Sequence, residues 1–225
     1  MLQEVSELCP EAWQKTFLVH NPITVKVVPG VYNPFNHRCV YVGRLRNSEK
    51  RLDRLLKAFK LFNVEHGDWR LTLVGDGEDR LFLESLIEQL GLGEQVDISG
   101  WKSDAWQYIS DTGGAPFLAL TSDHEGFPMA LCEAIVNGLS VVALDCPVWP
   151  SAIVSDGVNG VLVPSGPTEE ETIQNIAGAF SRVADGKVIF DVELIRSSVN
   201  AYMPSTVRNE WEDLLRTMEK KGRLP

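Results

Sequence analysis

Two glutamates, Glu125 and Glu133, are separated by seven residues in a segment that reads as a strand, a turn and a helix. The apolar run over 116–120 is short enough for a strand buried on both faces. Pro128 suits the first position of a helix, and Gly138 suits the left-handed residue that ends one. A helix N-terminus attracts phosphate, whereas carboxylates suit sugar hydroxyls. The segment therefore predicts a ligand that is part phosphate and part sugar, although a solvated acidic helix start would have the same residues.

Basic residues follow an earlier predicted strand at 40–42. Arg44 comes directly after Gly43 at the end of this strand, and Lys50 lies where the next helix begins. A guanidinium and an ammonium group in these places can both reach one diphosphate. A solvated basic loop is the alternative, because three more arginines follow within ten residues of Arg44.

Two glycine turns mark the ends of the next two predicted strands. The first turn contains Gly75, Asp76 and Gly77, and we interpret it as a tight turn close to a nucleotide. Gly100 is followed by Trp101 and Lys102. The indole of Trp101 is placed to stack on a base such as uracil, and a half-buried structural tryptophan is the equal alternative.

No metal site is predicted. The acidic pair Asp76 and Asp79 lies in the glycine turn without a nearby His or Cys, and such acids are usually solvated. The four cysteines show no CxxC spacing and mostly lie in apolar segments, which favours buried free thiols and a reducing cytoplasm. We also expect no bound cofactor.

Composition excludes several classes of function. Apolar residues make up 44% of the chain and charged residues 23%, which is typical of a globular protein. The net charge of -10 argues against binding to nucleic acid or to anionic lipid. No apolar run approaches the roughly 20 residues of a transmembrane helix, and the N-terminus lacks the pattern of a signal peptide.

Strands and helices alternate from Cys39 to about Ala184. This order predicts an α/β fold with a Rossmann-like, mostly parallel sheet, helices on both faces, and ligands at the carboxyl ends of the strands. Helices with an apolar stripe on one face are expected at 52–59, 83–90 and 173–180, and a last helix is expected from about Ser205. The predicted strands are 40–42, 70–74, 95–99, 116–120, 140–144 and 161–163.

The spacing of Glu125 and Glu133, with the words Glu-Gly-Phe-Pro-Met and Leu-Cys-Glu-Ala around them, resembles the Glu-x7-Glu motif of glycosyltransferase family 4. The resemblance implies that Glu125 contacts the donor sugar and Glu133 the ribose. It also implies that Arg44 and Lys50 bind the donor pyrophosphate. Arg44, Lys50 and Glu125 are thus the expected catalytic residues. The expected substrate-binding residues are Gly43, Gly75, Trp101, Lys102, Gly126, Phe127, Pro128, Met129 and Glu133.

The resemblance covers the C-terminal, donor-binding half of a two-domain GT-B enzyme. It implies that residues 1–35 are a remnant of the N-terminal domain with a linker, and that 36–200 form the nucleotide-sugar-binding domain. Residues 201–225 would be a helix that crosses back to the N-terminal domain, with Trp211 and Leu215 on an exposed apolar face. The acceptor would bind mainly to that N-terminal domain, so this chain alone would bind UDP or a UDP-sugar weakly and transfer nothing.

The expected function is that of a retaining hexosyltransferase with a UDP-linked donor and a glycan or lipid-linked saccharide acceptor. The sequence around Glu125, Ser-Asp-His-Glu-Gly-Phe-Pro-Met, is similar to that of bacterial lipopolysaccharide core galactosyltransferases. The expected location is the cytoplasm, at the inner face of the membrane through the N-terminal domain. Two alternatives remain: a UDP-sugar epimerase of the same architecture, or a non-catalytic nucleotide-sugar-binding subunit of a split transferase.

Overall fold

The computed structural model describes residues 17, 19–147 and 149–220. Contacts divide the chain into a large unit, Lys26–Ser198, and a small one that includes the described residues 17, 19–25 and 199–220. Residues 1–16 of the predicted N-terminal remnant lie outside the described part. The assignment of the termini to an N-terminal domain and a crossing helix stays a prediction.

The large unit is built on a six-stranded parallel sheet with the order β3-β2-β1-β4-β5-β6. The chain moves outward from β1 to β3 and then returns to β4, so the order reverses between β1 and β4. The predicted parallel sheet is confirmed, and this reversal is where such folds form a ligand crevice. The strands are β1 Arg38–Val42, β2 Arg70–Val74, β3 Val96–Gly100, β4 Phe117–Leu120, β5 Ser140–Leu144 and β6 Gly160–Val163.

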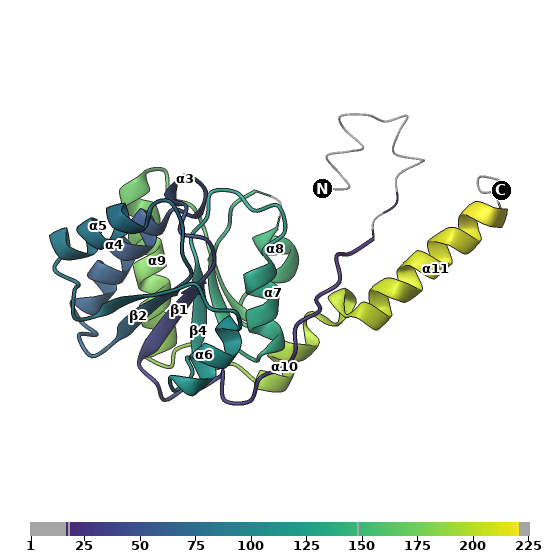
Figure 1. Ribbon diagram of the computed structural model, residues 1–225, viewed down its shortest axis with the longest axis horizontal. Helices are drawn as coiled ribbons and strands as arrows, with labels where there is room; N and C mark the ends of the chain where they lie inside the picture. Colours follow the sequence, from purple (N-terminus) through teal and green to yellow (C-terminus); the bar gives the residue numbers. More distant parts are fainter. Residues whose placement is uncertain (1–16, 18, 148, 221–225) are drawn as a thin grey trace. The chain divides into compact units, whose positions relative to one another are not determined.

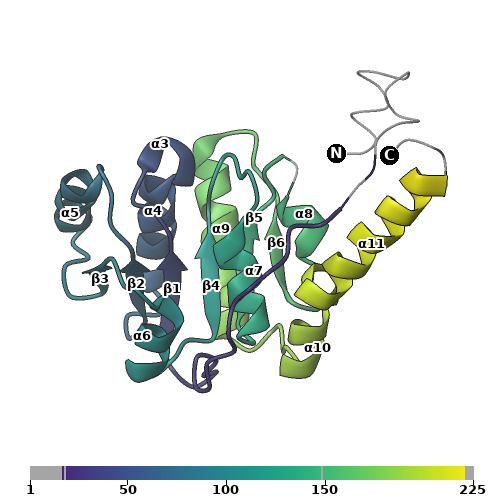
Figure 2. The same cartoon turned by 45° about the vertical axis from the view of Figure 1, so that its right-hand side comes forward.

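Helices cover both faces of the sheet, as the sequence predicted (Figures 1 and 2). One face carries α4 Leu52–Asn63, α5 Arg80–Gln89 and α9 Glu169–Ala184, and α4 packs closely against α9. The other face carries α6 Ala105–Asp111 and α7 Met129–Val136, with α10 Val192–Ser197 packed on α7. Two short helices, α3 Asn47–Lys50 and α8 Pro150–Ile153, complete this unit within the described residues.

The main core lies between the sheet and the layer of α4 and α9. The predicted stripe of α4, from Leu52 to Phe59, is confirmed, since its apolar members are fully buried. Alternate residues of β1, Cys39 and Tyr41, point into the same core. The stripe of α9 ends at the fully buried Phe180. This burial provides the rigid support for the strand ends.

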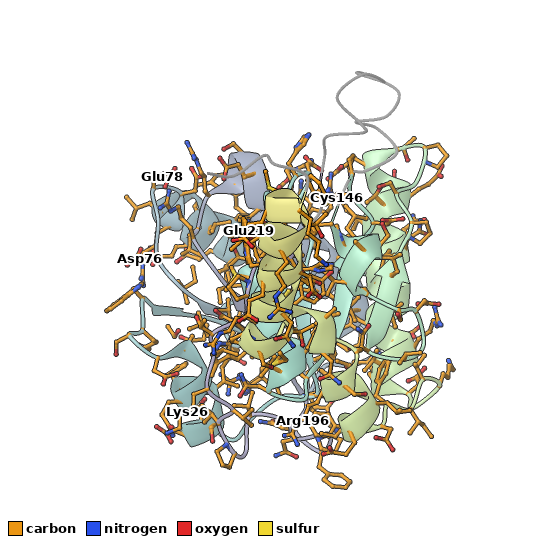
Figure 3. All side chains as sticks on the ribbon, turned by 90° about the vertical axis from the view of Figure 1, so that its right-hand side faces the viewer. Lys26, Asp76, Glu78, Cys146, Arg196 and Glu219 are labelled. Carbon is orange, nitrogen blue, oxygen red and sulfur yellow. The ribbon has the colours of Figure 1, made fainter. Side chains whose placement is uncertain are left out.

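The carboxyl ends of β1 and β2 approach each other closely at two glycines. A Cβ atom on Gly75 would lie only 1.8 Å from the carbonyl oxygen of Gly43, and one on Gly77 only 2.4 Å from that of Leu45. The tight turn predicted here is confirmed. Figure 3 shows Asp76 of this turn at one end of the sheet, and Lys26 at the other end.

The turn after β2 also holds the short helix α3. A carboxylate oxygen of Asp79 accepts a hydrogen bond from the backbone N–H of Asn47 at 2.6 Å. Asn47 is the first residue of α3, whose last residue is Lys50. The N-cap position itself makes no side-chain capping bond, so Asp79 fills that role from another loop.

Part of the segment that we assigned to a linker packs onto the large unit. Val28 and Val31 are buried, and the backbone N–H of Val28 donates to the side chain of Asn137 at 2.8 Å. Tyr32 forms a parallel bridge with Ala115. The contacts therefore start this unit at Lys26, earlier than the predicted residue 36.

The small unit contains the short η1 Asn200–Tyr202 and the long helix α11 Pro204–Lys220. The His20 ring contacts a carboxylate oxygen of Glu210 at 2.8 Å, and the backbone N–H of Ile23 donates to the Tyr202 carbonyl. Trp211 and Leu215 are about half exposed, as predicted for this helix.

We predict that Gly75→Ala lowers the free energy of unfolding by at least about 2 kcal/mol, because its methyl group would collide with the backbone of β1. Gly178→Ala is the control, since nothing lies within 4 Å of the added carbon on the exposed side of α9. That change should be neutral or stabilise by up to about 1 kcal/mol. Urea unfolding measures both. Equal stabilities of the two variants would contradict the close approach.

Candidate active site

Two neighbouring cavities open at the carboxyl ends of the strands, with volumes of about 350 and 310 Å³. Both are lined by Val42, Gly43 and Arg44 at the end of β1. The first cavity continues along β2 and β3, and the second runs to β4 and the start of α7. The first is also lined by Val74, Gly75, Asp76, Trp101, Lys102 and Ala105, and the second by Tyr41, Lys50, Leu120, Glu125, Phe127, Pro128, Met129, Ala130, Leu131 and Glu133.

The second cavity contains a bidentate ion pair between Lys50 and Glu125. The ammonium nitrogen of Lys50 donates to both carboxylate oxygens of Glu125, each at 2.8 Å. The hydroxyl of Ser122 also donates to Glu125, at 2.6 Å. The Glu125 side chain is only 5% exposed. The structure thus brings together two predicted catalytic residues from segments 75 residues apart, and it pairs them with each other.

Arginines hold the loop that carries Glu125. Arg54 donates to Asp123 at 2.7 Å and to both carboxylate oxygens of Glu169, and Arg51 donates to Asp123 and Glu169 as well. The hydroxyl of Thr121 donates to the backbone carbonyls of Lys50 and Arg51. Arg54 is only 5% exposed. The alternative of a solvated basic loop is therefore wrong for Arg54.

This network shifts the titration of its carboxylates. The hydrogen bond from Arg54 is the main reason why the pKa of Glu169 lies below its usual value, and this effect exceeds the opposing one of burial. Burial raises the pKa of Asp123, but hydrogen bonds from Arg51 and Arg54 more than offset it, so its net shift is downward. Both acids therefore remain ionised partners of the arginines at neutral pH.

Glu133 has a different kind of partner. Its Oε2 accepts a hydrogen bond of 2.9 Å from the indole Nε1–H of Trp106, which is buried in α6. Burial raises the pKa of Glu133, the Trp106 hydrogen bond acts against this rise, and the charge of Asp104 adds to it. Sequence reasoning missed Trp106 as a functional residue, because no local pattern connects positions on two separate helices.

Arg44 is exposed and lies at the border of the two cavities. Among the residues that the structure describes, its guanidinium forms no ion pair. Its backbone carbonyl accepts a hydrogen bond of 2.9 Å from the hydroxyl of Tyr41, a residue that sequence reasoning also missed. Burial, and then the charge of Glu125, raise the pKa of Tyr41 well above its usual value. Tyr41 therefore stays a neutral donor that fixes the backbone at Arg44.

The first cavity contains the predicted base-binding residues. Trp101 is 72% exposed, so the alternative of a half-buried structural tryptophan is wrong. The ammonium group of Lys102 donates to the carbonyl of Ser99 at 2.6 Å and lies 4.7 Å from the ring centre of Tyr108. Lys102 is therefore held by the protein itself. Asp76, which we assigned only to the turn, also lines this cavity.

The start of α7 differs slightly from the prediction. Pro128 is the N-cap residue and not the first helical residue. The backbone N–H of Met129 donates a hydrogen bond to the Phe127 carbonyl, and that of Leu131 donates to the Pro128 carbonyl. The amide of Ala130 is the one in this first turn without an acceptor among the described residues. Gly138 has the left-handed conformation predicted for the helix end.

The remaining residues that were predicted to bind the sugar donor lie around the start of this helix. The Phe127 ring packs edge-on against Trp149, with ring centres 4.9 Å apart. Met129 is 38% exposed, and a Cβ atom on Gly126 would meet open space. Gly126 is therefore not required by packing. The structure places these residues beside the cavity but does not test their roles.

The cysteines in the described residues are buried free thiols, as predicted. Burial raises the pKa of Cys132 to about 12 and that of Cys146 to about 11, so both are unreactive at neutral pH. Cys9 lies outside the described residues. The described part contains no group of three or more His, Cys, Asp or Glu arranged to hold a metal ion.

The sequence also matches a known family and several known proteins. The sequence model of the family described as glycosyl transferases group 1 matches residues 36–181. The chain belongs to this family. A lipopolysaccharide 1,6-galactosyltransferase of Salmonella typhimurium is 30% identical over 193 residues, and that of Escherichia coli is 28% identical over 192 residues. These alignments cover 84% of the chain but only 52% and 51% of the two relatives, so the chain spans about half their length.

Two solved structures share the fold of this chain. The lipopolysaccharide outer core galactosyltransferase WaaB, in its apo form, is 26% identical and superposes with a TM-score of 0.84 over 96% of this chain and 59% of its own. The Anabaena protein HepE, in complex with UDP, is 22% identical and gives a TM-score of 0.66 over 81% of this chain and 49% of its own. The predicted Rossmann-like fold, that of the C-terminal half of a GT-B glycosyltransferase, is confirmed. No helix among the described residues is long and apolar enough to cross a bilayer.

We predict that Arg54→Met lowers the free energy of unfolding by about 2 kcal/mol at neutral pH, because Asp123 and Glu169 lose a shared buried partner. The control is Arg46→Met, whose ion pairs with Glu49 and Glu78 are exposed. That change should alter stability by less than about 1 kcal/mol.

The pH dependence of stability gives an independent check of the same network. Because the pKa values of Asp123 and Glu169 are lowered in the folded state, their stabilising contribution is present above the unfolded pKa, near 4. It is lost as pH falls through the lower folded values. Arg54→Met should therefore make the loss of stability between about pH 5 and about pH 2 shallower. Parallel pH curves for the two proteins would contradict the network's role.

Proposed function

We propose that this chain is the donor-binding half of a retaining hexosyltransferase that uses a UDP-linked sugar. The observation that carries the proposal is the convergence of Arg44, Lys50, Glu125 and Glu133 on adjoining cavities at the carboxyl ends of the strands. The family membership of residues 36–181 supports it. So do the UDP complexes of structurally similar proteins, although these show only the fold.

The order of side chains along the cavities suggests how a donor would lie. The exposed indole of Trp101 would stack on the base in the first cavity. Glu133 would accept hydrogen bonds from the ribose, and Arg44 and Lys50 would bind the diphosphate between the cavities. Glu125 would then orient the hexose. Each part of the donor thus meets a group of suitable charge.

In the proposed reaction the bond between C1 of the hexose and the diphosphate oxygen breaks, and a bond from an acceptor hydroxyl to C1 forms on the same face. The acceptor proton passes to an oxygen of the departing phosphate. Arg44 and Lys50 would stabilise the negative charge that develops on the diphosphate, and stabilisation of this kind often contributes more to catalysis than any other effect. Glu125 is already engaged by Lys50 and Ser122, which suits an orienting role better than that of a nucleophile.

The proposal includes a metal-independent site, in which the two cations supplied by the chain meet the charge of the diphosphate. It also includes a lipid-linked or glycan acceptor, by analogy with the lipopolysaccharide galactosyltransferases that the chain resembles. We infer that this acceptor binds mainly to another domain, and that the reaction takes place at the cytoplasmic face of a membrane. The buried free thiols fit a reducing compartment.

We predict that UDP binds to this chain and that Arg44→Ala weakens the binding by about 10-fold or more, because a charge-assisted contact with the diphosphate is lost. Titration calorimetry measures both affinities. Arg46→Ala is the matched control, since Arg46 is a neighbouring arginine already paired with Glu49 and Glu78. Failure of the unmodified chain to bind UDP, or equal binding by the Arg44→Ala variant, would overturn the proposal.

We predict that Glu125→Gln strengthens the binding of UDP by about 5-fold, because Lys50 is released from its carboxylate partner. The same change should reduce the additional affinity that a UDP-hexose has over UDP, since the hexose hydroxyls lose a charged acceptor and keep only the neutral amide oxygen. Glu49→Gln serves as the control, because Glu49 is exposed and pairs with Arg46 on α3. The assigned role of Glu125 is wrong if Glu125→Gln lowers the affinity for UDP and leaves the ratio of the affinities for UDP-hexose and UDP unchanged.

A further inference from the structure

The two glutamates of the site have partners of different charge. Glu125 is neutralised by Lys50, which donates to both of its oxygens. Glu133 forms no ion pair with any residue that the structure describes, and its side chain accepts one hydrogen bond, from the neutral indole of Trp106. Among the described residues no cation balances the carboxylate of Glu133, whereas Lys50 pairs with that of Glu125.

The position of Trp106 makes it suited to orient Glu133. The indole is 4% exposed, and its residue follows Ala105, which lines the first cavity. Its Nε1–H reaches Oε2 of Glu133, which lines the second cavity. The hydrogen bond thus joins α6, which borders the first cavity through Ala105, to α7, which borders the second through Glu133.

The chemistry of an indole matters for this arrangement. Its N–H can donate but cannot accept, so it can satisfy only one oxygen of a carboxylate. The indole fixes the orientation of that carboxylate and leaves its charge unbalanced. An arginine or lysine in the same place would balance the charge. Oε1 of Glu133 accepts no hydrogen bond from the described residues. This oxygen remains available for a ligand hydroxyl, and the nearby charge of Asp104 strengthens the negative potential.

We propose that Trp106 is a positioning residue that gives the site its selectivity for ribose over deoxyribose, by holding Glu133 with one oxygen directed at the 2′ and 3′ hydroxyls. The inference rests on the proposed binding of UDP. It goes beyond the binding of ribose by a glutamate, since it assigns the discrimination to the neutral donor behind that glutamate. The hydrogen bond from Trp106 opposes the effect of burial on the pKa of Glu133, which favours the ionised acceptor.

The test compares the affinities of UDP and 2′-deoxy-UDP by calorimetry in the unmodified chain and in Trp106→Phe. The unmodified chain should prefer UDP by about 10-fold, the value of one hydrogen bond to a charged group. Trp106→Phe should bring this ratio to within about 2-fold. The control is Trp69→Phe, because Trp69 is equally buried in the core between the sheet and α4 and makes no contact with Glu133.

A second variant separates the hydrogen bond from packing. Replacing Trp106 by 3-benzothienylalanine keeps the shape of the ring and removes only the N–H donor, so α6 should stay folded. The selectivity should be lost in this variant too. A ratio equal to that of the unmodified chain, in either folded variant, overturns the inference. Failure of the unmodified chain to bind either nucleotide is a different outcome, since it refutes the proposed function on which the inference rests.

Discussion

The candidate site depends on the contact between Lys50 and Glu125. A carboxylate that is 5% exposed has lost most of its water, and the ammonium group of Lys50 and the hydroxyl of Ser122 replace it. Such pairs contribute little net stability, because desolvation offsets most of the Coulomb attraction. The position of the pair in the second cavity agrees better with the proposed role in binding a ligand. A ligand that brings both phosphate and hydroxyl groups can satisfy its two members at once.

Other charges near this pair hold the site in shape. Arg54 and Arg51 share Asp123 and Glu169, and they connect the loop after β4 to the starts of α4 and α9. Arg54 binds Glu169 through two parallel hydrogen bonds, a bidentate geometry that suits arginine better than lysine. Arg44, by contrast, forms no ion pair among the described residues and lies at the border of both cavities. Arg51 and Arg54 therefore form ion pairs within the protein, whereas the guanidinium of Arg44 is left for a ligand.

The shape of the crevice depends on backbone contacts as much as on charges. Gly75 allows the turn after β2 to approach the end of β1, and the turn then provides Asp79 as a cap for α3. This cap fixes the helix whose last residue is Lys50. A change at the end of β2 is thus expected to reach the ion pair through a chain of direct contacts. The glycine turn is structural, but it determines where a functional side chain lies.

The sequence by itself determined the parallel α/β fold, the family, and the residue types of the site. Apolar stripes and strand runs are local patterns, and the helices bury them as predicted, as in α4. Glu125 and Glu133 lie in one local segment, so their spacing was sufficient to select them as candidates.

Only the tertiary structure decided how these side chains are paired. Lys50 and Glu125 are 75 residues apart, and Trp106 and Glu133 are 27 apart, so no local pattern connects them. The same holds for Arg54, which counted only toward the alternative of a solvated basic loop and is buried against Asp123 and Glu169. The physical reason is that the charge state and orientation of a side chain depend on which other strand end or helix the fold places next to it.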